Sequence, residues 1–367
     1  MSHKVPAQIK RRGRSRDLSS SPKPSTRART AAPVPQASPP ASSGGVSPPG
    51  PPAGASALDP AAQTCSAQIL ACPADGPPIA RDDTLVREEP LEIRIRGRGI
   101  AVTMRTPGAD AELAAGFLIT EGLIHSHADL VEIAHCGRGE AALLGNTLNV
   151  FLAPHVSVDF ERLTRHVFAS SSCGLCGKAS IESVHQNFPP LTSHLTLDPA
   201  IIHELPEKLR AEQTAFTTTG GLHGAAIFDS RGNLVVARED VGRHNAVDKV
   251  IGHALLKNLL PLDQHVLLVS GRASFEIMQK ALAARVPIVA AVSAPSSLAV
   301  EFARASGQTL IGFLRGRSFN VYAHPERITG ASAIARGGPI GPTRPGGPVG
   351  PVGPILPLRP IRRRPRP

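Results

Sequence analysis

The sequence predicts an α/β fold, a three-layer structure around a substantially parallel or mixed sheet, with a disordered tail at each end. Short apolar runs such as Val266–Val269 and Ile288–Val292 have the length and composition of buried strands. Helical segments of about ten residues, such as Phe275–Ala284, separate them. Buried strands that alternate with helices indicate helices on both faces of a sheet. Proline marks the tails, because 22 of the 36 prolines lie in residues 1–60 and 331–367.

The expected elements follow from apolar periodicity. Leu91, Ile93 and Ile95 alternate with charged residues, as in a half-buried strand. The full set is strands at 91–96, 100–105, 225–228, 234–237, 266–269, 288–292, 309–314 and 318–321, with helices at 112–121, 245–257, 275–284 and 297–305. The segments 225–228 and 234–237 form a hairpin across Ser230-Arg231-Gly232-Asn233.

Composition divides the 367 residues into four parts. Residues 1–74 are a basic extension rich in Pro and Ser, 75–170 a smaller N-terminal α/β part, 171–329 the core, and 330–367 a Gly/Pro/Arg tail. The formal net charge is +11, but residues 1–60 and 331–367 carry +7 each, which leaves −3 for the rest. The folded part is therefore not a basic nucleic-acid groove, and the chain has no apolar run long enough to span a membrane.

Two of the five cysteines form a Cys-Gly-Leu-Cys motif, Cys173 and Cys176, in a Ser/Gly-rich loop. Nearby Lys178 and a following helix N-terminus would favour the thiolate. We considered a structural zinc site completed by Cys136, His135 or His223, a thioredoxin-type redox pair, a zinc nucleobase deaminase, and two buried, unreactive cysteines. A sulfur carrier that holds sulfur as a persulfide also fits. The odd cysteine count and the absence of a signal sequence favour a reducing compartment.

Polar clusters follow several strands. Thr217–Gly224 is expected to be a loop with His223 as its one titratable group, and Arg238–Asn245 joins a strand to a helix. Ser270–Ser274 and Ser293–Ser297 repeat that strand-to-helix junction. Open α/β sheets bind ligands at the carboxyl ends of their strands, and helix N-termini favour anions. The candidate contacts to a phosphate-bearing ligand are His223, Asp240, Arg243, His244 and Arg272, together with the turn Phe313, Leu314, Arg315, Gly316, Arg317 and Ser318, whose two arginines suit phosphate or guanine-edge contacts. The alternatives are that His223 is a hydrogen-bonded turn residue, that Asp240 only caps the helix, and that the turn is an exposed charged hairpin.

Six stretches together resemble a known family: MRTPGADAELAAGFLITEG, SSCGLCGKAS, TGGLHGAA, EDVGRHNAVDKVIG, SGRASFEIMQKA and GFLRGRSFNVYAHPERI. In that order, over about residues 80–328, they resemble the formate dehydrogenase accessory sulfurtransferase family (FdhD type). Both tails lie outside the resemblance.

The resemblance implies a cytoplasmic, homodimeric sulfur carrier with a cytidine-deaminase-like core that lacks zinc. It implies that the protein takes sulfur from a cysteine desulfurase and delivers it to the molybdenum of a bis(molybdopterin guanine dinucleotide) cofactor for formate dehydrogenase. It also implies that Cys173 carries the persulfide with Cys176 as its partner, and that residues 313–318 contact the cofactor. Two rivals remain, a deaminase-like metal hydrolase and a protein that binds nucleic acid through its basic tails.

Overall fold

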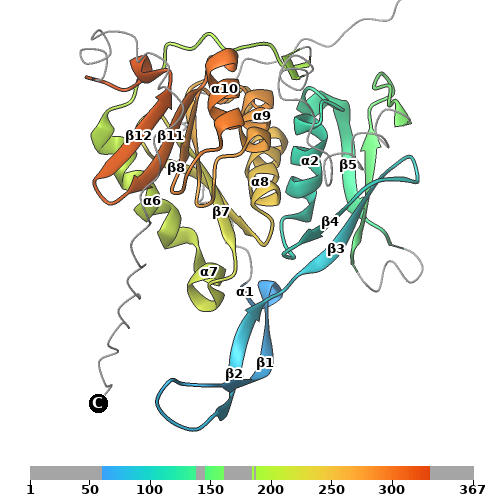
Figure 1. Cartoon of the computed structure of the whole chain (residues 1–367). Coiled ribbons are helices and arrows are strands. Elements are labelled where there is room, and N and C mark those ends of the chain that lie inside the picture. Colours follow the sequence, from blue (N-terminus) through green and yellow to red (C-terminus); the bar gives the residue numbers. More distant parts are fainter. Residues whose placement is uncertain (1–59, 138–144, 161–183, 186, 331–367) are drawn as a thin grey trace, which may run out of the picture. The chain divides into compact units, whose positions relative to one another are not determined.

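The computed structural model describes residues 60–137, 145–160, 184–185 and 187–330. Cys173 and Cys176, and nearly all of both predicted tails, lie outside these residues. The described part is a mixed α/β fold, which agrees with the predicted class (Figure 1). A likeness of its core to cytidine deaminases stays a prediction.

The elements have the following bounds in chain order. They are α1 (Pro60–Gln63), β1 (Thr64–Ala71), β2 (Ile79–Val86), β3 (Glu89–Ile95), β4 (Arg98–Arg105), α2 (Asp110–Thr120), η1 (His127–Asp129), β5 (Leu130–His135), β6 (Thr147–Leu152), α6 (Pro199–Glu212), α7 (Thr214–Thr219), β7 (His223–Asp229), β8 (Leu234–Asp240), α8 (Arg243–Leu256), β9 (His265–Val269), α9 (Phe275–Ala283), β10 (Ile288–Ala291), α10 (Ser297–Ser306), β11 (Thr309–Arg315), β12 (Ser318–Ala323) and η2 (Pro325–Arg327).

The larger sheet has six strands in the order β12-β11-β10-β9-β7-β8. The pairs β9–β10 and β10–β11 are parallel and the other three pairs are antiparallel, so the sheet is mixed. Successive side chains point to opposite faces. Leu267 and Val289 pack in the cluster that includes α8 and α9, whereas Leu268 and Ala290 pack in the cluster that includes α6. Figure 1 shows these helices on the two sides of the strands, which gives the three expected layers.

The smaller sheet has four strands in the order β4-β3-β6-β5. Leu91, Ile93 and Ile95 of β3 are buried, as their alternation predicts. They belong to the same hydrophobic cluster as Leu113 and Leu118 of α2, so α2 covers one face of this sheet. In Figure 1, α2 lies between the four-stranded sheet and α8.

Two glycines allow α2 and α8 to cross closely. A Cβ atom on Gly116 would lie 1.8 Å from the carbonyl oxygen of Asp248, and one on Gly252 would lie 1.8 Å from that of Glu112. Any larger residue would push the helices apart. Beside this crossing, Glu112 accepts hydrogen bonds from the Arg238 guanidinium, at 2.6 and 2.8 Å, and lies 2.9 Å from His253 Nδ1.

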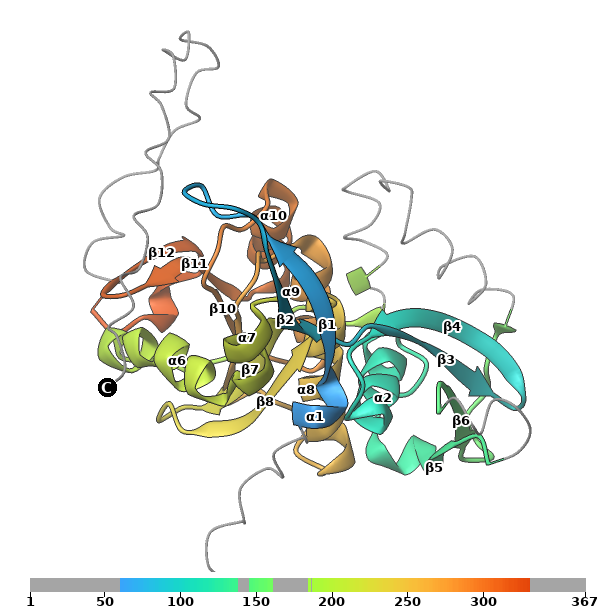
Figure 2. The ribbon, with the colours of Figure 1, turned by 90° about the horizontal axis from the view of Figure 1, so that it is seen from below.

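Strands β1 and β2 form a separate two-stranded hairpin with eight residue pairs, from Thr64 with Val86 to Ala71 with Ile79 (Figure 2). The base of the hairpin contacts the rest of the chain at Gly221. A Cβ atom built on Gly221 would lie 3.2 Å from Val86 Cγ1. The sequence boundary at residue 74 assigned β1 to the disordered extension. In the structure, Pro60–Gln63 and Thr64–Ala71 of that extension already form α1 and β1.

Several other elements differ from the sequence expectations. β5, β6 and α6 were not among the expected elements, and residues 217–219 of the predicted loop belong to α7. Threonine hydroxyls donate back to carbonyls one turn earlier, as from Thr217 to Gln213 at 2.7 Å. The carboxylate of Glu239 accepts hydrogen bonds from the N–H groups of Ala215 and Phe216 and caps the start of α7. A tertiary contact therefore forms a helix where local composition favours a loop.

Candidate functional site

The predicted polar clusters meet at one edge of the six-stranded sheet. His223 begins β7 and pairs in register with Asp240 at the end of β8. The next residue, Gly224, donates to Ser270 Oγ at 2.8 Å, just after β9. At the end of β11, Phe313 N donates to the carbonyl of Ser293, which follows β10, at 3.1 Å. The strand ends thus lie side by side, as the sequence predicted.

Three helices begin at this same edge, each just after a strand end. Their N-cap residues are Gly242 for α8, Ser274 for α9 and Ser296 for α10. Ser296 caps its own helix, but neither Gly242 nor Ser274 forms a side-chain cap hydrogen bond. Backbone N–H groups at uncapped helix starts are donors for an anion.

Arg243 is the strongest candidate for a ligand contact. Its Nε atom is buried, and it has no hydrogen-bond partner among the described residues. Buried donors in proteins are almost always paired. Gly271 lies close to both Arg243 and His223. A Cβ atom built on Gly271 would lie 3.9 Å from Arg243 Cβ and 3.4 Å from His223 Nδ1. The unpaired Nε beside an uncapped helix start indicates a place for an anionic oxygen.

The two histidines of the site are neutral at physiological pH. Burial and the charges of Arg243 and Lys280 lower the pKa of His244 to about 4. Burial, followed by the charge of Arg243, also lowers the pKa of His223. His244 Nε2 lies 3.4 Å from Ser274 Oγ. The positive charge of the site therefore comes from arginines, including the exposed Arg272, while the histidines offer neutral hydrogen-bonding groups.

Asp240 has a different place from the other predicted contacts. It is fully buried, and it forms a 2.7 Å ion pair with Lys249. It also accepts hydrogen bonds from Gly242 N at 2.8 Å and from Asn245 Nδ2 at 2.9 Å. With no exposed atom, Asp240 holds the turn before α8 and does not reach a ligand, so its predicted role as a contact is corrected to a supporting one.

The turn between β11 and β12 brings the predicted residues 313–318 to the sheet edge. Phe313 is 40% exposed and has a positive φ of 53°, an unfavourable conformation for a bulky residue that is found at functional sites. Arg315 Nε donates to the carbonyl of Val292 at 2.8 Å, and its guanidinium lies 5.7 Å from the Phe313 ring centre. Gly316, Arg317 and Ser318 are exposed, whereas Leu314 is fully buried in the cluster with α6 and anchors the turn.

Sequence reasoning missed the groups behind the site. Lys249 of α8 is fully buried, and so is Thr106, which follows β4 of the four-stranded sheet. Asn245 was recognised only as part of a polar cluster. Glu276, which lies 3.9 Å from His244, was also missed. A lysine within the apolar periodicity of 245–257 was the one available signal.

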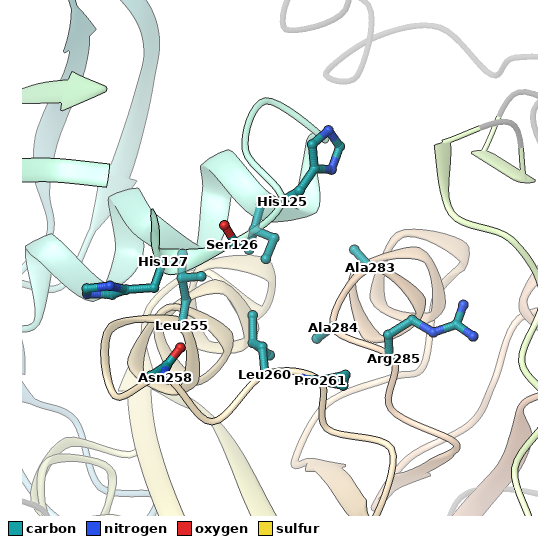
Figure 3. Close-up of a pocket in the computed structure, with 11 residues that line it drawn as sticks. His125, Ser126, His127, Leu255, Asn258, Leu260, Pro261, Ala283, Ala284 and Arg285 are labelled. Carbon is teal, nitrogen blue, oxygen red and sulfur yellow. The ribbon is translucent and has the colours of Figure 1, made fainter. Parts of the chain in front are cut away.

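A pocket of about 280 Å³ lies elsewhere, between the C-terminal ends of α2, α8 and α9 (Figure 3). Leu255, Leu260 and Ala284 are among its apolar lining, and His125, His127 and Arg285 are its ionisable residues. No residue predicted for the site lines it. This pocket and the candidate site are therefore at opposite ends of α8.

Two further observations concern metal binding and membrane spanning. Within residues 60–137, 145–160, 184–185 and 187–330, no three His, Cys, Asp or Glu side chains are grouped to hold a metal ion. The zinc alternative required Cys173 and Cys176, which are not described, so it stays untested. No helix in the described ranges has the length and apolar character needed to cross a bilayer.

The fold and the site define a mixed α/β protein with a candidate anion site at the strand ends of its larger sheet, built from helix starts and arginines. Residues 86–329 match the FdhD/NarQ family, and the chain belongs to that family. This confirms the resemblance drawn from the six motifs.

The proteins similar to this chain include the following two relatives and one solved structure. A protein of Streptomyces coelicolor named sulfur carrier protein FdhD is 52% identical over 269 residues, which cover 72% of this chain and 95% of that protein. The protein of the same name from Mycobacterium tuberculosis is 52% identical over 258 residues, with 68% and 94% covered. The crystal structure of a protein from Desulfotalea psychrophila, described as a formate dehydrogenase accessory protein, has a TM-score of 0.59 and 26% identity, and covers 72% of this chain and 99% of that one.

Proposed function

We propose that this protein is a sulfur carrier for formate dehydrogenase. It accepts sulfur from a cysteine desulfurase as a persulfide on Cys173 and passes it to the molybdenum cofactor, which is bound at the sheet edge. The relatives named sulfur carrier protein support the general activity. The observation that carries the binding part is the buried, unpaired Nε of Arg243 beside an uncapped helix start, which suits a phosphate oxygen of the cofactor.

Loading of sulfur is a thiol exchange. The Cys173 thiolate attacks the outer sulfur of the desulfurase persulfide, the sulfur–sulfur bond of the donor breaks, and the donor cysteine leaves as a thiolate. A new sulfur–sulfur bond forms on Cys173, so electrons balance without another reactant. Cys176 acts as the partner thiol. We further propose that the protein works in the cytoplasm as a homodimer and uses neither nucleic acid nor a membrane as its partner.

The cofactor is cargo, and the sheet edge would recognise its charged ends. Each half of a bis(molybdopterin guanine dinucleotide) carries a diphosphate and a guanine. Arg243, Arg272 and the starts of α8 and α9 supply donors for phosphate oxygens. Arg315, which lies beside the exposed Phe313, and Arg317 would present charge and an aromatic face to the base.

Intact mass measurement tests the sulfur step. After incubation with a cysteine desulfurase and cysteine, the wild-type protein should gain ~32 Da, the mass of one sulfur atom added to a thiolate. Cys173→Ala should abolish the gain, and Cys176→Ala should lower its yield less. Normal loading of Cys173→Ala together with failure of Cys176→Ala would reverse the two roles.

Calorimetry with GDP tests the binding step independently. Replacing both Arg315 and Arg317 with Ala should weaken GDP binding by about 2–4 kcal/mol, since two charge-assisted contacts are lost. Arg231→Ala is the control, because Arg231 lies in the exposed β7–β8 turn, away from the site edge. Equal affinity of wild type and double variant would remove the turn from the site without affecting the sulfur chemistry.

A further inference from the structure

The turn before α8 leads into Arg243 and His244, and only part of its backbone is hydrogen-bonded within the turn. Gly242 has no side chain to cap the helix, and its N–H donates to Asp240 Oδ1 at 2.8 Å. The preceding N–H, of Val241, donates to Thr106 Oγ1 at 3.2 Å. The turn that precedes Arg243 is thus bonded to a hydroxyl group 135 residues away in the chain.

Thr106 directly follows β4 of the four-stranded sheet and is fully buried. Besides its hydroxyl bond, its N–H donates to Asp240 Oδ2 at 3.2 Å, and its carbonyl accepts from Lys249 Nζ at 2.9 Å. One residue therefore contacts the turn and both members of the buried Asp240–Lys249 pair. Buried polar networks of this kind fix a single geometry when every member is satisfied.

A second connection runs beside the first. Asn245 Nδ2 donates to the Met104 carbonyl at 2.8 Å and to Asp240 Oδ1 at 2.9 Å. Asn245 Oδ1 accepts from Thr103 Oγ1 at 3.1 Å. The residues at the end of β4 therefore hydrogen-bond to the start of α8 at two points, Val241 before the helix and Asn245 in its first turn.

We propose that Thr106 is a positioning residue for the anion site. Its hydroxyl fixes the Asp240–Gly242 turn and so sets the direction of the Arg243 guanidinium, without itself reaching a ligand. The four-stranded sheet, which supplies none of the predicted contacts, thereby becomes part of the binding machinery. This inference rests on the proposed binding of an anion at the sheet edge.

The test compares two buried threonines. Thr106→Val removes the hydroxyl and keeps the shape of the side chain. Thr120→Val is the matched control, because Thr120 is also fully buried and its hydroxyl contacts another buried ion pair, Asp248 with Lys280. Thr106→Ser keeps the hydroxyl and serves as the rescue. GDP affinity is measured by calorimetry, and exchange of the Val241 and Gly242 amide protons by NMR.

We expect Thr106→Val to weaken GDP binding roughly five- to tenfold, the scale of one lost hydrogen bond, and to speed exchange of the Val241 amide. Thr120→Val should lower stability but leave affinity and Val241 exchange near the wild-type values, and Thr106→Ser should behave as wild type. If Thr106→Val does not fold, Thr103→Val, on a half-buried strand position, should show a smaller loss of affinity in the same direction.

Two results would overturn the inference. One is an equal loss of affinity in Thr106→Val and Thr120→Val, which would indicate a general effect of stability. The other is faster Val241 exchange in Thr106→Val with unchanged GDP affinity. If Thr103→Val has to be used instead, an unchanged GDP affinity in that variant would also overturn the inference. Failure of the wild-type protein to bind GDP would instead remove the proposed binding function, and this inference with it.

Discussion

The two larger sheets differ in what covers their second face. The six-stranded sheet is buried on both faces, by α8 and α9 on one side and α6 on the other. The four-stranded sheet is covered by α2 on one face, and four large apolar side chains on its strands are exposed: Val102 at 68%, Met104 at 47%, Val131 at 67% and Phe151 at 51%. On the strands of the larger sheet the corresponding exposed residue is Phe313, in the site turn.

This difference separates two roles. A sheet that is packed on both faces is a stiff platform, so the ends of its strands can hold ligand-binding groups in fixed positions. The smaller sheet contributes through its contacts with α8, at the α2–α8 crossing and at Thr106. Three regions can be compared: the six-stranded sheet (the platform), the α2–α8 crossing (the joint) and the exposed face of the four-stranded sheet (the open face). Substitutions in them should differ greatly in the free energy of unfolding that they remove.

The joint should be the most sensitive point. Gly252→Ala places a methyl group 1.8 Å from the Glu112 carbonyl oxygen, so α2 and α8 must separate. We expect a loss of more than ~5 kcal/mol in the free energy of unfolding, enough to prevent folding. Expression and denaturant unfolding measure it, with Gly137→Ala as the control because no atom lies within 4 Å of its added Cβ. Normal stability of Gly252→Ala would show that α2 and α8 do not pack this closely.

The platform should come next. Phe228 is fully buried in the cluster with α6, and Phe228→Ala should cost ~3–5 kcal/mol through lost apolar burial and the cavity left behind. Chemical denaturation gives the value. A cost below ~1 kcal/mol would mean that α6 does not seal this face of the sheet.

At the edge of the platform, His244 gives the protein a pH dependence with a definite sign. Its folded pKa of about 4 lies below the ordinary value of 6.5, so below pH 6.5 the unfolded chain takes up a proton that the folded protein does not. The stability that depends on His244 should fall between about pH 6.5 and pH 4, then level off. Because 35% of the side chain is exposed, solvent screens part of this effect.

Unfolding curves across this pH range for wild type and His244→Asn isolate the contribution of His244. The stability of the wild type relative to the variant should decrease as the pH falls through the window. A constant difference from pH 7 to pH 4 would contradict the burial of a neutral imidazole at the site.

The open face should show the smallest effect. Phe151→Ala makes the same chemical change as Phe228→Ala, but on an exposed side chain, and should alter the free energy of unfolding by no more than ~0.5 kcal/mol. The two phenylalanine variants are measured together by denaturant titration. A cost for Phe151→Ala close to that of Phe228→Ala would show that the open face is covered in solution, and the contrast between the sheets would fail.

Local patterns predicted the parts of the fold that depend on local physics. The alternation of Leu91, Ile93 and Ile95 gave β3, and apolar runs gave β9 and β10, because burial of one or both faces leaves a repeat in the sequence. Helix α6 was missed although Asp198 caps it and Pro199 stands at its first turn, both helix-start signals. Pro206 inside the helix hides the pattern of buried Ile202, Leu205 and Leu209.

The sequence by itself determined the α/β class, the family and the strand-end position of the site, because strand and helix periods and the chemistry of junction residues are local properties. Only the tertiary structure decided which junction residues are buried and which keep an unpaired polar atom. It placed Asp240 and Leu314 inside, left Arg243 Nε unpaired, and brought Thr106 to Val241. Those outcomes depend on how close two helices approach and on the register between distant strands, and these are set by packing between segments more than a hundred residues apart.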